Sequence, residues 1–146
     1  MSYLVDTNVL SELRRKQPDP HVVHWFSARP AGTLYLSVLT LGEIRKGVEA
    51  MSDPNRRLPL LDWLETDLAA FFEGRILPVD GAVAEVWGRM QAKAGRPLPA
   101  IDSLLAATAL HHGLMLVTRN VRDMDGLGVT LINPWSLPDR STAQRG

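Results

Sequence analysis

An aspartate follows the first apolar segment of the chain, at a position where a carboxylate could take part in chemistry. The run Tyr3–Val5 is short and apolar, as expected for a strand buried on both faces, and Asp6 ends it. Thr7 and Asn8 come next and favour the start of a helix. Because ligands bind outside the carboxyl ends of strands in open α/β sheets, Asp6 is a candidate site residue. A helix cap without chemistry explains this junction equally well when it is taken alone.

A second acid, Glu43, lies in a predicted helix that begins after Ser37. On a helical wheel it falls outside the apolar stripe of that helix and away from the middle of its charged face. Its neighbours one turn away, Thr40 and Gly47, are small and leave room for a ligand. A solvated helix glutamate is the alternative and, for Glu43 alone, the more common case.

A third acid, Asp102, lies in the first turn of a predicted helix, where the positive end of the helix dipole favours a carboxylate. That preference alone explains an aspartate there. However, Leu105, Ala106 and Ala109 share its helix face and are predicted to pack against the sheet. A carboxylate on such a face needs a partner, because burying an unpaired charge is costly.

Asn120 and Asp123 follow the fourth predicted strand, and both could turn toward the same crevice as Asp6. An Asx-type turn would explain either residue equally well. If all these side chains meet, they form an acidic cluster, which repels itself unless a cation is present. Oxygen ligands without cysteine or a well-placed histidine suit Mg²⁺ or Mn²⁺ rather than zinc. Such ions are typical of phosphoryl-transfer sites, and in two-metal sites they lie about 3.5–4 Å apart.

Basic side chains near these acids could bind a phosphate backbone. They are Arg14, Arg15, Lys16, Arg45, Lys46, Arg119 and Arg122. The formal net charge of the chain is zero, so the basic residues would have to cluster locally to bind nucleic acid. The four tryptophans are expected to pack in the core or in a dimer interface, with base stacking as the less favoured alternative. They are Trp25, Trp63, Trp87 and Trp135.

Strands and helices alternate along the chain and would position these residues. Strands are predicted at residues 3–5, 34–36, 76–79, 114–117 and 129–132. Helices are predicted at about residues 8–15, 21–28, 38–51, 53–72, 81–94 and 100–112. Pro78 places the third strand near an edge of the sheet. The alternation predicts an α/β fold, a three-layer α/β/α sandwich with a central parallel sheet of four to five strands.

The length of 146 residues suits one domain with one sizeable core. We predict a single domain over residues 1–138 and a disordered polar tail over residues 139–146. The chain has no cysteines, which excludes disulfides and thiolate metal sites. Its apolar runs are too short to cross a bilayer and its N-terminus lacks a signal-peptide pattern, so we expect a cytoplasmic location and no membrane partner.

Four segments carry a set of motifs in a specific order. They are residues 4–12, which contain Asp6-Thr7-Asn8, and residues 37–43, 101–109 and 117–120. Together they resemble the PIN-domain ribonucleases, and more closely the VapC-type toxins of bacterial toxin–antitoxin pairs, including the FitB-like branch. Residues 74–80 and the ending Asn133-Pro134-Trp135 fit that branch too. The resemblance covers residues 3–137; the Asp-Thr-Asn motif alone is short, whereas the ordered set is specific.

The resemblance implies a PIN-like fold and a Mg²⁺-dependent endoribonuclease, with Mn²⁺ able to substitute, that cleaves RNA with metal-activated water. Asp6, Glu43 and Asp102 match the acidic triad of the family. The resemblance makes Asp6 and Asp102 the expected direct metal ligands, while Glu43 would hold a second metal or orient the water. The hydroxyls of Thr7 and Thr118 are expected to support these ligands.

The fourth acid of the family aligns with Asn120, so this chain departs from the strict four-acid pattern. Asp123, three residues further on, is the expected substitute. The departure concerns the affinity for a second metal and leaves the expected fold unchanged. The resemblance also implies a homodimer and a cognate antitoxin, a segment of which would lie across the active-site groove. Promoter DNA would be bound only through that antitoxin.

Two other interpretations differ in class. A haloacid-dehalogenase-like phosphatase also starts with a strand, an aspartate and a loop, but its second aspartate would fall at Asn8, and no lysine follows a later strand suitably. A non-catalytic PIN-like module would only bind a partner, and the intact set of Asp6, Glu43 and Asp102 argues against it. Titration with Mn²⁺ separates these possibilities, because a pure binding module has no reason to take up the metal.

Overall fold

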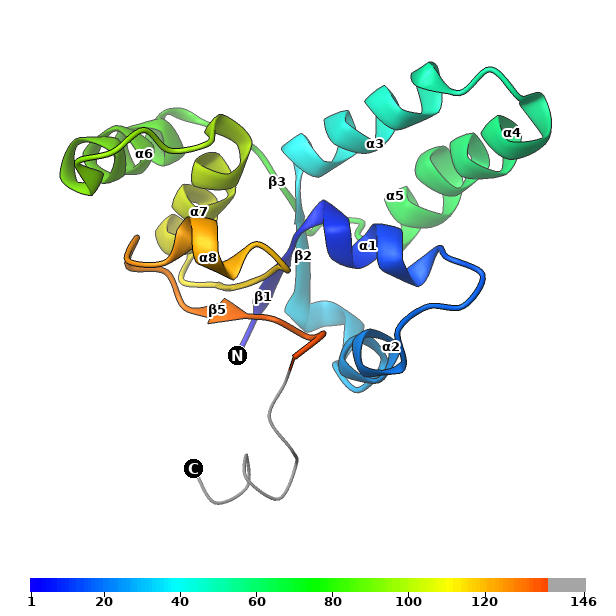
Figure 1. Ribbon diagram of the computed structural model, residues 1–146, viewed down its shortest axis with the longest axis horizontal. Coiled ribbons are helices and arrows are strands. Elements are labelled where there is room, and N and C mark those ends of the chain that lie inside the picture. Colours follow the sequence, from blue (N-terminus) through cyan, green and yellow to red (C-terminus); the bar gives the residue numbers. More distant parts are fainter. Residues whose placement is uncertain (137–146) are drawn as a thin grey trace.

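A parallel sheet of five strands forms the middle layer of the computed structural model, which describes residues 1–136 (Figure 1). The strand order is β3-β2-β1-β4-β5, and all neighbouring strands are parallel. The strands are β1 Tyr3–Val5, β2 Leu34–Ser37, β3 Ile76–Leu77, β4 Met115–Val117 and β5 Leu131–Ile132. The predicted parallel α/β sheet is confirmed. The predicted tail, residues 139–146, lies outside the described residues.

Helices cover both faces of the sheet, as predicted for three layers (Figure 1). One face carries α1 Thr7–Leu13, α2 Pro20–Ser27, α3 Val38–Ala50, α4 Pro54–Asp62, the π-helix η2 Trp63–Leu68 and α5 Ala69–Phe71, with the 3₁₀ turn η1 Ala31–Thr33 before β2. The other face carries α6 Gly81–Ala94, α7 Ala100–His112 and α8 Val121–Met124. Because side chains alternate along a strand, Tyr3 and Val5 of β1 pack in the first core and Leu4 packs in the second.

Strand β1 lies where the strand order reverses, because the chain passes from β1 to β2 on one side and later returns to β4 on the other. All three residues of β1 are buried. The backbone N–H of Asp6 donates to the Val117 carbonyl at 2.9 Å, which extends the pairing of β1 with β4. Ligands bind at such switch points, outside the carboxyl ends of the strands. The fold therefore delivers Asp6 to the crevice where a ligand is expected.

Two segments differ from the sequence prediction. The helix predicted at residues 53–72 is divided into α4, η2 and α5. Pro59 lies inside α4 and has no N–H to donate, and the wider π-helix begins at Trp63. The helix α8 is absent from the prediction, because four residues are too few to show a helical period. Within residues 1–136, no helix is long and apolar enough to span a membrane.

Candidate active site

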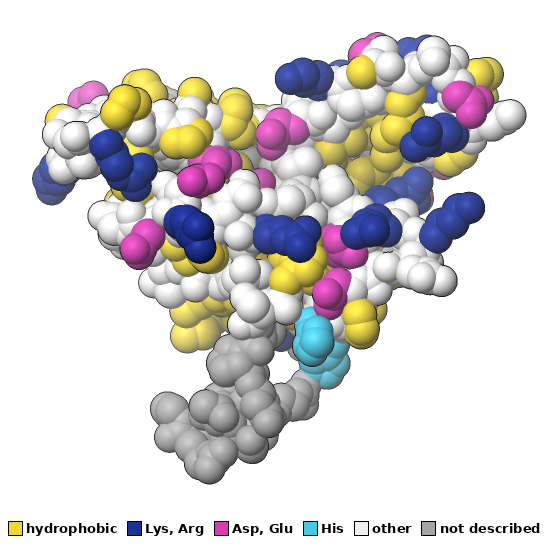
Figure 2. Space-filling model, viewed as in Figure 1, with side chains coloured by type: hydrophobic (Ala, Val, Ile, Leu, Met, Phe, Trp, Pro, Cys, Tyr) yellow, Lys and Arg dark blue, Asp and Glu magenta, His cyan; other side chains and the backbone are white. Residues whose placement is uncertain are grey.

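A cleft opens at the carboxyl ends of β1 and β4, and we call it the acidic cleft. Its walls bring together Asp6, Glu43, Asp102 and Asn120, four of the five side chains singled out from the sequence. Figure 2 shows acidic side chains gathered at the notch between the two upper arms of the molecule, with a row of basic side chains below them. The other lining residues are Thr7, Asn8, Ser11, Glu12, Arg15, Arg119 and Trp135.

Asp6 is a buried acid of this cleft, with 4% of its surface exposed. Its Oδ1 accepts from the backbone N–H of Thr7 at 2.6 Å, which caps α1, and its Oδ2 accepts from the Thr118 hydroxyl at 2.7 Å. Burial raises the pKa of Asp6 from 3.8 to about 6. The hydrogen bonds from Thr118 and Thr7 oppose this rise, whereas the charges of Asp102 and Glu43 add to it. Asp6 is therefore a helix cap and a cleft-facing carboxylate at once.

Asn8 and Thr118 hold the Asp6 carboxylate from the side of β4. Thr118 is fully buried, and its oxygen accepts from the backbone N–H of Asn120 at 3.0 Å and from the Asn8 amide at 3.4 Å. The Asn8 amide also lies 3.4 Å from Asp6 Oδ2, and its Oδ1 accepts from the Arg119 backbone N–H at 3.3 Å. The sequence predicted Asn8 to favour the start of a helix and placed it in the Asp-Thr-Asn motif, but assigned it no contact in the site. Its place in the Asp-Thr-Asn motif is the signal that could have revealed this contact.

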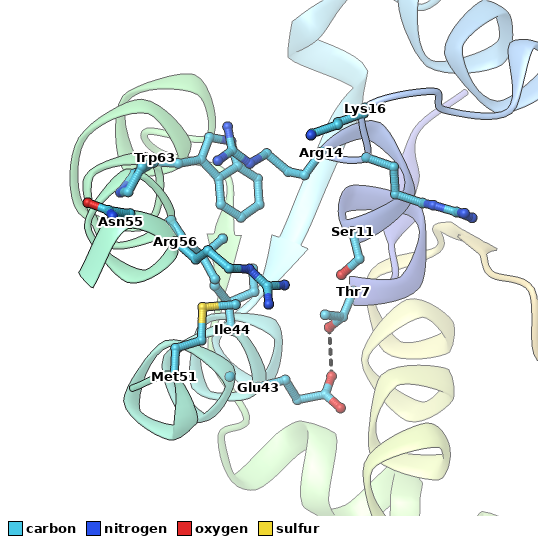
Figure 3. A pocket seen from close by; sticks show the side chains of 14 residues that line it. Thr7, Ser11, Arg14, Lys16, Glu43, Ile44, Met51, Asn55, Arg56 and Trp63 are labelled. Carbon is cyan, nitrogen blue, oxygen red and sulfur yellow. Dashed lines mark hydrogen bonds between the residues drawn. The ribbon is translucent and has the colours of Figure 1, made fainter. Parts of the chain in front are cut away.

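Glu43 faces the acidic cleft from α3 and remains exposed to solvent. Its Oε1 accepts from the Thr7 hydroxyl at 2.6 Å (Figure 3). Thr7 thus contacts two acids, because its backbone N–H binds Asp6. Of the two small neighbours of Glu43, Gly47 lines an adjoining hollow. Thr40 is fully buried, so the expectation that it leaves room for a ligand is wrong.

Asp102 enters the acidic cleft from the first turn of α7 and is half-buried. Burial raises the pKa of Asp102, and the charges of Asp123 and Glu43 raise it further. A hydrogen bond from the Asn120 amide lowers it. The predicted packing face of α7 is confirmed by three fully buried residues, Leu105, Ala106 and Ala109.

The two candidates that follow β4 occupy different places. Asn120 lines the acidic cleft, and its side chain lowers the pKa of Asp102. Asp123 lies on α8 and is exposed, and it acts on Asp102 through its charge. Asp123 is not among the residues that line the cleft. Asn120 is therefore the one of the two that lines the cleft together with Asp6, Glu43 and Asp102.

Glu12 is a buried acid of the cleft to which the sequence assigned no role. It is 5% exposed, and its Oε2 accepts from the backbone N–H of Asp19 at 2.8 Å. Its Oε1 accepts from the Arg15 guanidinium at 3.3 Å. The hydrogen bond from Asp19 is the main cause that lowers the pKa of Glu12. Because these partners satisfy the carboxylate, Glu12 anchors the turn between α1 and α2.

The donors of the acidic cleft suit a hard cation, because the available ligands are carboxylate, hydroxyl and amide oxygens. The buried Asp6 carboxylate lies near the charges of two further acids, and a cation would relieve that repulsion. Within residues 1–136, no group of three or more histidine or acidic side chains lies close enough to hold one ion. Mg²⁺ usually binds one or two carboxylates and keeps several waters, and the Asp6 and Asp102 carboxylates are ligands of the type that it prefers.

A second hollow, which we call the basic groove, adjoins the acidic cleft and lies between α1, α3 and α4 (Figure 3). The two hollows share Thr7, Ser11, Arg15 and Glu43. The basic groove is lined by four cations, Arg14, Arg15, Lys16 and Arg56. Among the other predicted basic residues, Arg119 lines the acidic cleft, and Arg45 is paired with Glu65 at 2.7 Å. Positive charge is therefore clustered locally in a chain of zero net charge.

Comparison with known proteins shows the family of the chain. The sequence pattern of the PIN domain matches residues 3–126. VapC ribonuclease Y4jK of Sinorhizobium fredii is 37% identical and covers 90% of this chain and 96% of its own length. Toxin FitB of Neisseria gonorrhoeae is 36% identical and covers 90% of this chain and 97% of its own length.

Two solved structures have the same fold. FitAcB from Neisseria gonorrhoeae superposes with a TM-score of 0.87 at 36% identity, over 92% of this chain and 99% of the other. FitAB bound to the IR36 DNA fragment also superposes with a TM-score of 0.87, at 33% identity, over 94% of this chain and 99% of the other. Sequence and fold agree: the chain belongs to the PIN domain family, in its VapC-type, FitB-like branch.

Proposed function

We propose that this chain is a Mg²⁺-dependent endoribonuclease and the toxin of a toxin–antitoxin pair, with Mn²⁺ able to replace Mg²⁺. The observation that carries the proposal is the acidic cleft, where the buried carboxylate of Asp6 lies with Asp102 and Glu43. Relatives at 36% and 37% identity, named as a toxin and a ribonuclease, support the same activity.

Asp6 and Asp102 would hold the metal. When bound, the ion supplies Lewis-acid stabilisation of the phosphate oxygens and lowers the pKa of water. The Thr118 hydroxyl, at 2.7 Å from Asp6 Oδ2, keeps that carboxylate oriented toward the cleft. Glu43, held by the Thr7 hydroxyl at 2.6 Å, would orient the attacking water or contribute to a second metal site.

Asn120 and Asp123 would complete the site from the side of Asp102. The Asn120 amide would stabilise the ionised Asp102 carboxylate, whose pKa it lowers. Asp123 would add negative charge that strengthens the attraction for a cation, because its charge reaches Asp102. With a pKa of about 6, Asp6 is mostly ionised at neutral pH and available to a metal.

We further propose that the chain forms a homodimer and is neutralised by a cognate antitoxin that lies across the active-site groove. The FitB relative is a toxin, and FitAB has been solved on a DNA fragment, which supports a partner protein and promoter binding through it. A neighbouring reading frame that encodes a small DNA-binding protein would support this role.

The direct test is cleavage of a labelled RNA by the purified chain in Mg²⁺ and in EDTA. We expect cleavage only with the metal, and loss of cleavage in Asp6→Asn and Asp102→Asn, which should keep the circular dichroism spectrum of the parent. Cleavage in EDTA, or wild-type turnover in either variant, would overturn the proposal. Titration with Mn²⁺ addresses the alternative of a non-catalytic binding module, since the absence of Asp6-dependent uptake would favour that module.

A further inference from the structure

A row of polar side chains separates the acidic cleft from the basic groove, and we call it the polar ridge. It consists of Thr7, Ser11 and Arg15, which follow one another at a spacing of four residues and line both hollows. We propose that Ser11 and Arg15 form a nucleotide subsite, where the Ser11 hydroxyl contacts the 2′-hydroxyl of an RNA ribose and Arg15 contacts a phosphate. This inference rests on the proposed nuclease function.

The spacing places the three side chains on one side of α1. Residues four apart lie on the same face of a helix and are separated by about 6 Å along its axis. The backbone N–H of Arg15 donates to the Glu12 carbonyl at 3.1 Å, so the helical turn continues past Leu13, where α1 ends. Figure 3 shows Thr7 and Ser11 pointing from α1 into the same hollow. Ser11 therefore lies one turn beyond the contact between Thr7 and Glu43.

Ser11 is the member of the ridge whose polar group is free to bind a substrate. The Thr7 hydroxyl already donates to Glu43 at 2.6 Å. Ser11 is exposed, and within residues 1–136 its hydroxyl has no hydrogen-bond partner. By contrast, the exposed Ser27 of α2 donates its hydroxyl to the Val23 carbonyl at 2.8 Å. A substrate can therefore bind the Ser11 hydroxyl without breaking a hydrogen bond inside the protein.

Arg15 supplies a cation that is held at the edge of the cleft. Its side chain is 67% exposed, and one N–H of its guanidinium lies 3.3 Å from Oε1 of the buried Glu12 carboxylate. A guanidinium has five N–H donors, so most of them stay available for the oxygens of a phosphate. The Glu12 contact limits the positions that the guanidinium adopts. Arg15 therefore suits a phosphate beside the acidic cleft.

The order of the groups along the ridge matches the order of the groups in a nucleotide chain. A strand with one phosphate at the acids must cross the ridge to reach the cations of the basic groove. If the next phosphate lies at Arg15, the ribose between the two phosphates lies over Ser11. The Ser11 hydroxyl can donate and accept, and so can a ribose 2′-hydroxyl, which deoxyribose lacks. The subsite would therefore favour RNA over DNA.

The tryptophans are occupied in a different way. Trp25 is buried in the first core, Trp63 and Trp135 pack against that core, and Trp87 packs against the second. The predicted core packing is therefore confirmed for all four. Recognition of the sugar then depends on polar side chains, and Ser11 offers a free hydroxyl for it.

The test compares binding of a fluorescein-labelled single-stranded RNA and of the corresponding DNA by anisotropy, with the full chain in EDTA so that no cleavage occurs. Ser11→Ala should weaken RNA binding by about 2- to 13-fold, the effect of losing one neutral hydrogen bond, and should leave DNA binding unchanged. Ser27→Ala is the matched control and should change neither affinity. Thermal melting curves should match for the parent and both variants.

A chemical change in the RNA tests the same contact from the other side. Single 2′-deoxy substitutions are placed at each nucleotide of the RNA in turn. At one position the parent should lose the same factor as Ser11→Ala loses, and Ser11→Ala should lose nothing further there. Such non-additivity is the sign of two groups in direct contact.

Arg15→Gln tests the phosphate contact. It should weaken the binding of RNA and DNA alike, because both carry the same phosphates. It should also reduce the slope of log K against log salt concentration by about 0.7, the value for one phosphate contact on a single strand. A loss confined to RNA, or an unchanged slope, would overturn the assignment of Arg15.

The remaining outcomes decide the assignment of Ser11. Unchanged RNA affinity in the folded Ser11→Ala variant would overturn it, and so would a parent that binds DNA as tightly as RNA. Equal losses for RNA and DNA in Ser11→Ala would overturn it too, because they would indicate a phosphate contact. If the chain cleaves RNA in Mg²⁺ but Ser11→Ala changes nothing, the subsite fails and the nuclease stands. If Ser11 binds RNA as proposed but the chain never cleaves, the nuclease fails instead.

Discussion

The acidic cleft has an inner part and an outer part that are built differently. In the inner part, Asp6 is buried and receives hydrogen bonds from Thr7, Asn8 and Thr118. In the outer part, Glu43 is exposed and has one hydrogen bond, from the Thr7 hydroxyl. The inner carboxylate is therefore oriented by the fold, whereas the outer one can reorient in solvent.

This difference indicates a division of labour within the proposed site. A carboxylate that is already desolvated and oriented can hold an ion in a defined geometry, because its supporting hydrogen bonds are made in advance. An exposed glutamate can adjust to a substrate or a second ion as either arrives. Burial of Asp6 also destabilises the folded chain in the absence of a cation, since the ionised form is disfavoured there.

The largest expected effect on RNA cleavage follows from removing the charge of Asp6, the carboxylate of the inner part. Asp6→Asn should lower RNA cleavage by about 10³-fold or more, because metal assistance is worth several kcal/mol. Glu43→Gln should cost less, about 10- to 100-fold. Single-turnover cleavage of a labelled RNA measures both, with the exposed Asp125→Asn as a matched control. Equal losses in the two cleft variants would remove the distinction between inner and outer parts.

The inner part should also make stability depend on pH. The ordinary pKa of 3.8 applies to Asp6 in the unfolded chain, and the folded value is about 6. Below pH 3.8 both states are protonated, whereas between these values the unfolded chain loses the proton first and is favoured. The free energy of unfolding in EDTA should therefore fall by roughly 3 kcal/mol as the pH rises from about 4 to about 6, and should stay low above that.

Urea unfolding at a series of pH values measures this loss. Asp6→Asn should lack it and should be more stable than the parent at neutral pH without metal. Mg²⁺ added above pH 6 should restore part of the stability of the parent only. Identical pH profiles for the parent and Asp6→Asn would show that the Asp6 carboxyl is not desolvated.

A smaller effect is expected from the two supporting hydroxyls. Thr118→Val removes the 2.7 Å bond to Asp6 and should weaken Mn²⁺ binding by about 10- to 100-fold. Thr7→Val keeps the backbone bond to Asp6 and loses only the bond to the exposed Glu43, so we expect less than a tenfold change. Isothermal calorimetry gives both affinities. A larger loss of Mn²⁺ affinity in Thr7→Val than in Thr118→Val would mean that support of Glu43 matters more for metal binding than support of Asp6.

The smallest effect is expected from a substitution at Asn120. Asn120→Asp adds a carboxylate next to Asp102 and should tighten a second Mn²⁺ by about 3- to 10-fold, because ligand charge tunes affinity. In the same calorimetric titration, the affinity for the first Mn²⁺ should be unchanged. No change in either event would place Asn120 outside the metal-binding region.

Residues with a local signal could be predicted from the sequence. The apolar run Tyr3–Val5 and the abrupt change at Asp6 indicated a central strand and its carboxyl end, and both were confirmed. Contacts between distant segments could not be predicted in this way. The bond between Asn8 and Thr118 joins residues 110 positions apart, and no local pattern encodes it.

The sequence also did not reveal which way the side chains of short segments point. Whether Asn120 or Asp123 would line the cleft depends on α8, a helix too short to leave a periodic pattern. The π-helix that begins at Trp63 is also not revealed by an apolar period of 3.6. In both cases the residue types were recognised correctly from the sequence. The orientation of the side chains depends on three-dimensional packing.

The two outer strands of the sheet, β3 and β5, are each two residues long, and Pro78 follows β3 directly. Edges this short offer few free backbone groups, so another polypeptide cannot readily extend the sheet by strand addition. The sheet is therefore poorly suited to edge-to-edge pairing with a further chain. The proposed antitoxin or second copy would then contact helical surfaces and side-chain hollows.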